Sequence, residues 1–127
     1  MSDSVEGQWD HEVDLLVIGS GAGAMTTGIV GHDRGARVLL IEKGDHYGGS
    51  SAMSGGSLWV PNNHWMEGTG IDDSRADALA YLQEITAGEV AAEKLEAYVD
   101  HASETVKYLA ERAGLRMYSM PAYSDYY

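Results

Sequence analysis

The stretch that decides the fold is VDLLVIGSGAGAMTTGIVGHDRGARVLLIE, residues 13–42. Residues 13–19 are a short apolar run that ends at a glycine, which is typical of a strand buried on both faces. Residues 19–35 then indicate a tight turn that enters a helix, and residues 36–42 form a second apolar run of the same kind. The order predicts a β-α-β unit with parallel strands, the building block of a Rossmann-like α/β fold.

The predicted helix has an inner apolar stripe formed by Met25, Ile29 and Val30. Gly28 and Gly31 lie in the same helix, where glycine lowers helix propensity. We interpret both glycines as positions of close packing between helix and sheet.

A glycine pattern lies between the first strand and the helix. GSGAGA places Gly19, Gly21 and Ala24 in a dinucleotide-binding pattern, in which Gly19 permits the turn, Gly21 admits a pyrophosphate, and Ala24 lets helix and strand approach. The helix N-terminus offers free N–H groups to phosphate oxygens. Glu42, at the end of the second strand, is placed to accept hydrogen bonds from an adenosine ribose. A tight turn without a ligand, and Glu42 as an exposed acid, are the alternatives.

The glycine-serine loop GGSSAMSGG, residues 48–56, follows the second strand. A domain that binds only nicotinamide dinucleotides would usually continue with another helix and strand. This loop can instead present N–H and hydroxyl groups to a second face of the pyrophosphate and to a ribityl chain, which favours FAD. A flexible loop without a ligand is the alternative, although the nearby Trp59, Pro61 and Trp65 favour order.

Two further helices are expected in the second half. Residues 71–86 indicate a helix capped by Asp72 or Asp73. A longer helix over residues 90–113 ends at Gly114, and residues 115–120 indicate a short strand. The apolar stripe of the longer helix consists of Leu95, Val99, Ala102, Val106, Leu109 and Ala113.

Composition excludes several classes of protein. The 127 residues include 8 basic and 20 acidic side chains, a net charge of −12 that argues against nucleic acid and anionic membranes as partners. There is no cysteine, and the five histidines have no metal-ligand spacing, so we expect neither disulfides nor a metal site. The polar first residues do not resemble a secretion signal, and no apolar run approaches the about 20 residues of a membrane span. We therefore expect a cytoplasmic protein.

The motifs VIGSGAGAMTTGI, LLIEKGDHYGGSSAMSGGSLWVPNN and DYY together resemble the FAD-dependent 3-ketosteroid Δ1-dehydrogenases. These enzymes belong to the fumarate reductase and succinate dehydrogenase flavoprotein group. The resemblance extends from residue 13 to residue 127. It divides the chain into a polar lead-in (1–11), the N-terminal portion of an FAD-binding domain (12–71) and a helical segment that leads to an active-site tail (72–127).

The resemblance implies three groups of FAD-binding residues. One group holds the pyrophosphate, one the adenosine ribose, and one lies near the ribityl chain and the flavin ring. The pyrophosphate group consists of Gly19, Gly21, Ala22, Gly23 and Ala24, with Gly49, Ser50 and Ser51 on the opposite side. The adenosine ribose group is Glu42, with Lys43 beside it. The group near the ribityl chain and the flavin ring consists of Ser54, Gly55 and Gly56.

The resemblance also implies a reaction that removes two hydrogens from adjacent carbons of a cyclic ketone. A tyrosinate-like base takes the proton alpha to the ketone, and the hydride from the beta carbon goes to flavin N5. Tyr127, in DYY, would assist this base through a hydrogen bond, because a tyrosine of pKa about 10 needs a donor to stabilise its anion. The base matches no residue of this chain. Tyr127 as a surface or interface residue is the alternative.

Members of this family are several times longer than 127 residues, so we expect a second polypeptide to carry the rest of the flavoprotein. Two other functions stay open at this point. A fumarate-reductase-like enzyme would reduce an activated alkene and would need arginines such as Arg112 and Arg116 to bind carboxylates. A non-catalytic subunit would bind the nucleotide without performing a reaction.

Overall fold

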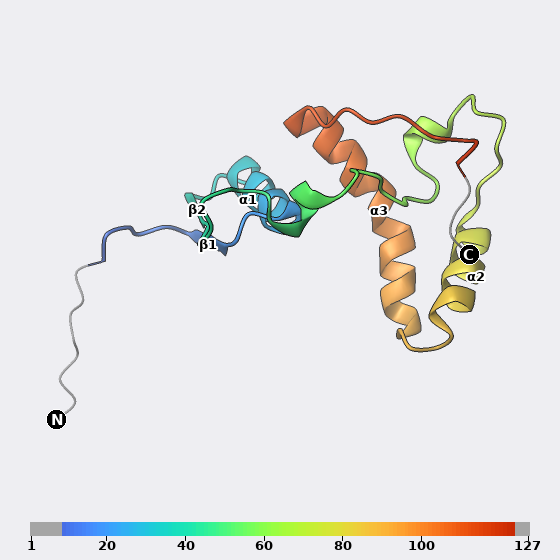
Figure 1. Cartoon of the computed structure of the whole chain (residues 1–127), viewed down its shortest axis with the longest axis horizontal. Helices are drawn as coiled ribbons and strands as arrows, with labels where there is room; N and C mark the ends of the chain where they lie inside the picture. The colour runs from blue at the N-terminus through green and yellow to red at the C-terminus, as the bar shows by residue number, and fades with distance from the viewer. Residues whose placement is uncertain (1–8, 124–127) are drawn as a thin grey trace. The chain divides into compact units, whose positions relative to one another are not determined.

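The computed structural model describes residues 9–123 of the chain (Figure 1). The chain forms two compact units, Met1–Ser57 and Leu58–Tyr127. Each unit has its own secondary structure, and the two are described separately. The division into domains at residues 11 and 71, made from the resemblance, stays a prediction.

The first unit contains the predicted β-α-β unit. Strand β1 (Leu15–Ile18) leads into helix α1 (Ala22–Asp33), which is followed by strand β2 (Val38–Ile41). The two strands pair in parallel, with Leu15 opposite Val38 and Ile18 opposite Ile41. A short 3-10 helix, η1 (Gly49–Met53), completes this unit. The α/β class and the parallel pairing are thereby confirmed.

Two glycines of α1 bring the helix against the strands. A Cβ added at Gly31 would lie 2.5 Å from Leu15 Cδ2 and 3.2 Å from Val38 Cγ2. One added at Gly28 would lie 3.9 Å from Val38 Cγ1, an ordinary contact. The prediction of close packing is therefore confirmed at Gly31, whereas at Gly28 a side-chain carbon would fit without overlap.

The strands are covered on one face only. Leu15 and Val38 face α1, and Val17 on the same face is 6% exposed. Because side chains alternate along a strand, Leu16, Ile18 and Ile41 belong to the opposite face, where they are 50%, 77% and 43% exposed. The prediction that both strands are buried on both faces is wrong for this chain, since α1 covers a single face.

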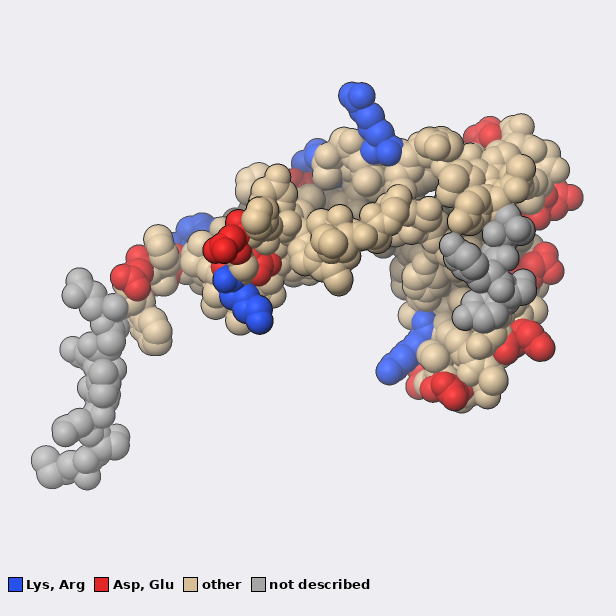
Figure 2. Space-filling view, in the orientation of Figure 1, with Lys and Arg blue, Asp and Glu red and all other residues tan. Residues whose placement is uncertain are grey.

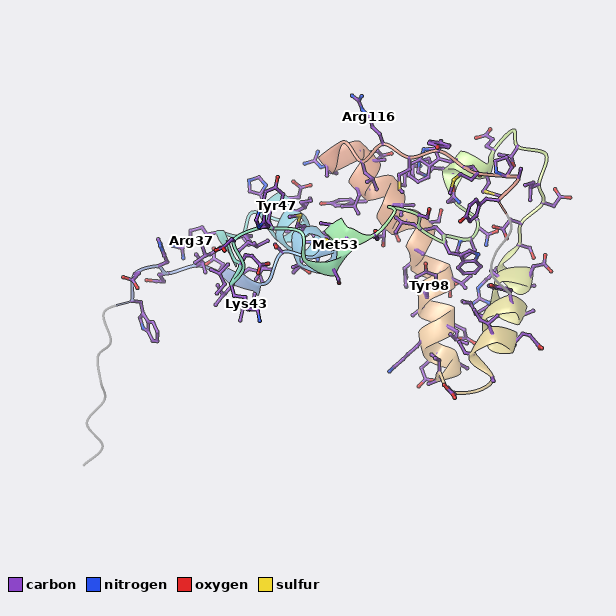
Figure 3. The ribbon with its side chains drawn as sticks, in the orientation of Figure 1. Arg37, Lys43, Tyr47, Met53, Tyr98 and Arg116 are labelled. Atoms are coloured by element: carbon purple, nitrogen blue, oxygen red, sulfur yellow. The ribbon has the colours of Figure 1, made fainter. Side chains whose placement is uncertain are left out.

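An ion pair aligns the beginnings of the two strands. The Arg37 side chain donates to both carboxylate oxygens of Asp14, at 3.2 and 3.1 Å, and the Arg37 backbone N–H donates to the same group at 2.9 Å. Figure 3 labels Arg37. The hydrogen bond from the Arg37 side chain is the main reason why the pKa of Asp14 is lowered. Both side chains are well exposed, so the ion pair contributes little to the free energy of unfolding. We interpret it as a contact that helps to align the two strands.

The second unit is built on two helices joined by a tight turn. After the 3-10 helix η2 (His64–Met66) come α2 (Arg75–Thr86) and α3 (Ala92–Ala113), which run in opposite directions in Figure 1. Arg75 of α2 donates to the Asp100 carboxylate of α3 at 2.5 and 2.9 Å. Figure 2 shows acidic side chains over α2 and the turn that joins it to α3.

The core of the second unit follows the predicted stripe of α3. Leu95, Val99 and Val106 are buried, and Ala78 from α2 is 3% exposed. Gly114, with φ of +68°, ends α3 as predicted. None of the helices in the described part of the chain is long and apolar enough to cross a membrane.

Two local predictions in this unit are wrong. Ser74, and neither Asp72 nor Asp73, caps α2: its hydroxyl accepts the Asp77 N–H at 3.1 Å and donates to the Asp77 carboxylate at 2.6 Å. Residues 115–120 form no strand, because no segment between residues 9 and 123 pairs with them.

The packing of α1 makes a prediction for a matched pair of variants in the flavoprotein. Gly28→Ala and Gly31→Ala gain the same helix propensity, about 1 kcal/mol. Only the Cβ at residue 31 overlaps its neighbours, so we expect Gly31→Ala to be about 1–3 kcal/mol less stable than Gly28→Ala. Thermal unfolding of both variants measures the difference, and equal unfolding temperatures would contradict the packing described here.

Candidate functional site

A buried serine hydroxyl connects the turn after β1 with the end of β2. Ser20 is 1% exposed, and its hydroxyl donates to Glu42 Oε2. The same hydroxyl accepts the Gly48 N–H at 2.8 Å. Both strands end here, and the carboxyl ends of parallel strands are where ligands bind in open α/β sheets. Ser20 therefore fixes three segments around the position where a ligand would bind.

Glu42 is held as a carboxylate by several hydrogen bonds. Its Oε2 accepts from Ser20 and its Oε1 accepts the Gly44 N–H at 2.9 Å. These hydrogen bonds, that from Ser20 first, lower the pKa of Glu42. The backbone N–H groups of Lys43 and Ser20 also lower this pKa, so Glu42 accepts from several donors around the end of β2. The geometry fits the role that the sequence suggested for Glu42.

The glycine-serine loop lies against the turn that opens α1. The Ala22 N–H, in the first turn of α1, donates to Ser51 Oγ at 3.1 Å. A Cβ added at Gly49 would lie 3.4 Å from Gly21 Cα, and Gly49 has φ of +54°. At Gly49 the positive φ, which side chains rarely adopt, brings the loop backbone up to that of Gly21. The predicted pyrophosphate residues of the turn and of the loop are therefore brought together.

The turn itself offers a bare backbone to an anion. Gly19 has φ of +94°, a conformation that glycine adopts readily. A Cβ added at Gly19 or Gly23 would meet no heavy atom within 4 Å, so this edge of the backbone faces open space. The first turn of α1 carries no acidic residue, so the partial positive charge of its N-terminus is not neutralised there. These features fit a diphosphate group.

The other predicted FAD residues lie on the same loop or next to it. Ser54 Oγ donates to the Ser51 carbonyl at 2.9 Å and accepts the Gly56 N–H at 3.1 Å. These bonds define a turn at this part of the loop. Gly55, Ser50 and Lys43 are exposed, and Figure 3 labels Lys43 in the first unit. Tyr127, the predicted catalytic residue, lies outside the described residues.

The sequence analysis missed two residues of this site, Ser20 and Gly48. Ser20 lies between the glycines of the motif, and its burial depends on the loop that returns to it 28 residues later. Gly48 has φ of +108° and directs its N–H toward Ser20. The one signal in the sequence is that a small hydroxyl residue stands next to Gly19, directly after an apolar strand.

Residues 14–122 match the family described as FAD binding domain. The chain is 40% identical to the 3-oxosteroid 1-dehydrogenase of Mycobacterium tuberculosis, over 92% of this chain and 21% of that protein. It therefore spans about a fifth of the length of this relative.

Two solved structures resemble the chain. One is a 3-ketosteroid delta1-dehydrogenase from Sterolibacterium denitrificans in complex with 1,4-androstadiene-3,17-dione, at a TM-score of 0.72 and 47% identity, over 78% of this chain and 17% of that one. The other is a 3-ketosteroid-delta4-(5alpha)-dehydrogenase from Rhodococcus jostii RHA1 in complex with 4-androstene-3,17-dione. Its TM-score is 0.78 at 25% identity, over 87% of this chain and 23% of that one.

The hydrogen bonds of Glu42 make a prediction about pH. The pKa of Glu42 is lower in the folded protein than in the unfolded chain, so its hydrogen bonds stabilise the fold at pH values above the pKa of the unfolded chain. This stabilisation is lost as the pH falls through the pKa that Glu42 has in the folded protein. Ser20→Ala removes the main cause of the lowering, so the folded pKa rises. We expect acid-induced release of FAD from this variant to begin at a higher pH, measured by the fluorescence of released flavin.

Thr27→Ala is the control for this experiment. Thr27 is an exposed residue of α1 whose hydroxyl donates to the Gly23 carbonyl of its own helix at 2.8 Å. It has no hydrogen bond with Glu42, so its acid profile should match that of the wild type. A Ser20→Ala profile that also matches the wild type would show that Ser20 does not set the pKa of Glu42.

Proposed function

Because the chain belongs to the FAD binding domain family, we propose that it forms the FAD-binding part of a flavin-dependent dehydrogenase that desaturates a cyclic ketone. The assignment of FAD rests on the cradle, in which the turn at residues 19–22 contacts the loop at residues 48–51 around Ser20. The observation that supports the substrate is the 40% identity, over 92% of this chain, to a 3-oxosteroid 1-dehydrogenase.

In this proposal three groups of residues would hold FAD. The turn, the first turn of α1 and the facing loop would hold the pyrophosphate, and Glu42, with Lys43 beside it, would hold the adenosine ribose. When bound, FAD supplies the acceptor for the hydride. The residues in contact are Gly19, Gly21, Ala22, Gly23, Ala24, Gly49, Ser50 and Ser51 for the pyrophosphate, with Ser54, Gly55 and Gly56 toward the flavin ring.

The chain contributes one candidate residue to the proton transfer. A base removes the proton alpha to the ketone, and the ketone oxygen takes up the negative charge that develops. Tyr127 donates a hydrogen bond to this base and stabilises its anionic form, as a second hydroxyl group can do. The base itself and the groups that polarise the ketone lie outside the 127 residues.

The remaining parts of the flavoprotein have a surface to cover. Leu16, Ile18 and Ile41 expose an apolar face of the sheet, and further structure packed on it would bury that face, as in other parallel sheets. That these parts lie on a second polypeptide remains a prediction, as does a cytoplasmic location. The intact masses in the purified flavoprotein test the first point: a species of 13.7 kDa beside a larger one confirms it, and a single larger species contradicts it.

The reaction makes a prediction for the assembled flavoprotein. We expect yellow protein whose visible flavin absorbance bleaches without oxygen when 4-androstene-3,17-dione is added, because the ketone transfers a hydride to the flavin. A protein that the steroid does not bleach, and whose reduced flavin is reoxidised by fumarate, is an alkene reductase. Colourless protein after reconstitution with excess FAD would contradict the cofactor as well.

The role of Tyr127 makes a separate prediction. Tyr127→Phe removes the donor that stabilises the anionic base, so we expect kcat to fall by about 100-fold, within the range typical of acid-base groups. FAD content should not change, because no FAD contact is assigned to Tyr127. Tyr126→Phe is the matched control, since we assign no role to that hydroxyl. Equal kcat values for the two variants would refute the catalytic role of Tyr127.

A further inference from the structure

A chain of hydrogen bonds leaves the turn after β1 at Ser20 and returns to the first residue of α1. The Ser20 hydroxyl accepts the Gly48 N–H at 2.8 Å, and the Gly48 carbonyl accepts the Ala52 N–H of η1 at 3.2 Å. The same short helix carries Ser51, whose hydroxyl accepts the Ala22 N–H at 3.1 Å. The glycine-serine loop is therefore held to the turn at two points, Ser20 and Ala22.

Glu42 is attached to this chain of bonds through the same hydroxyl. Ser20 donates its one proton to Glu42 Oε2, while a lone pair of its oxygen accepts from Gly48, so the two bonds do not compete. The Gly44 N–H holds the other carboxylate oxygen at 2.9 Å. Ser20 is 1% exposed, so water does not replace either of its partners. One oxygen atom thus sets the position of both the carboxylate and the loop.

The two groups that Ser20 connects have different expected tasks. In the dinucleotide pattern, an acid at the end of the second strand recognises the 2′-hydroxyl of the adenosine ribose. The N–H groups that open the helix recognise the pyrophosphate. A hydrogen bond weakens steeply when its angle departs from the preferred one. Recognition of the ribose by Glu42 therefore depends on the bond that orients its carboxylate.

We propose that Ser20 is a positioning residue that determines the preference of the cradle for an adenosine ribose with a 2′-hydroxyl, because it orients Glu42 from the loop that faces the pyrophosphate. This inference rests on the proposed function, in which the cradle binds FAD. It assigns to Ser20 no contact with the cofactor, so removal of its hydroxyl should change which nucleotide is preferred as well as how tightly it is bound.

The test compares two nucleotides on the assembled flavoprotein freed of its cofactor. They are FAD and an FAD analogue with 2′-deoxyadenosine, and the quenching of flavin fluorescence gives both dissociation constants. We expect the wild type to bind FAD about tenfold more tightly than the analogue, the effect of one hydrogen bond to a charged group. In Ser20→Ala we expect weaker binding of FAD and a preference of about threefold or less, because Glu42 loses the bond that orients it.

Two further variants complete the test. Ser51→Ala is the matched control: it removes a hydroxyl that holds the same loop but has no hydrogen bond with Glu42. It should weaken both nucleotides by the same factor and keep the tenfold preference of the wild type. Ser20→Cys keeps a side chain of similar size whose thiol is a weaker donor and acceptor. Its preference should lie between those of Ser20→Ala and the wild type, and it replaces Ser20→Ala if that variant does not fold.

Three outcomes would contradict the inference. Wild-type preference in the Ser20 variants, with both nucleotides weakened equally, would mean a purely structural role and would overturn this inference alone. A wild type that binds the two nucleotides equally well would remove the ribose role of Glu42, and with it this inference, but not the binding of FAD. A wild type that binds neither nucleotide would overturn the proposed function as well.

Discussion

The hydrogen bonds of one buried hydroxyl hold the cofactor cradle together. Ser20 donates to Glu42 at the end of β2 and accepts the Gly48 N–H from the loop beyond it. Other hydrogen bonds connect these segments in pairs: the Gly19 N–H donates to the Ile41 carbonyl at 2.7 Å, and the Ala22 N–H donates to Ser51 Oγ at 3.1 Å. The Ser20 hydroxyl bonds to the end of β2 and to the loop at once. An unpaired polar group in a buried position costs about 1–3 kcal/mol, so the segments are favoured in the arrangement that keeps both hydrogen bonds of the Ser20 hydroxyl.

Close backbone approach is the second constraint, and glycine provides it twice. At Gly31 the absence of a side chain lets α1 settle on Leu15 and Val38, which sets the distance between helix and sheet. At Gly49, which has a φ of +54°, it lets the loop reach the N-terminus of α1, where the Ala22 N–H donates to Ser51. The first approach supports the fold, and the second shapes the site, because the N-terminus of α1 directs its partial charge into the cradle.

In the second unit, polar contacts join the two helices and hold a loop in place. Arg75 and Asp100 join α2 to α3, while Tyr98, Ser103 and Asp73 hold residues 59–62 by their backbone. A loop held at its main chain is fixed in position whatever its side chains are. Such a loop can present Trp59 in a constant orientation, stacked on Tyr98.

The sequence by itself determined the β-α-β unit, the glycine turn, Glu42 and the apolar stripe of α3, because all of these depend on local periodicity or on one residue's backbone freedom. It also indicated close packing on the sheet at Gly28 and Gly31, which the structure bears out at Gly31. Only the tertiary structure decided the role of Ser20, whose partners lie 22 and 28 residues away. The tertiary structure also decided that Ser74 caps α2, because Asp73 accepts a hydrogen bond from the Asn62 N–H instead. Residues 115–120 have strand-like composition but form no strand, because a strand needs a partner and local sequence cannot specify one.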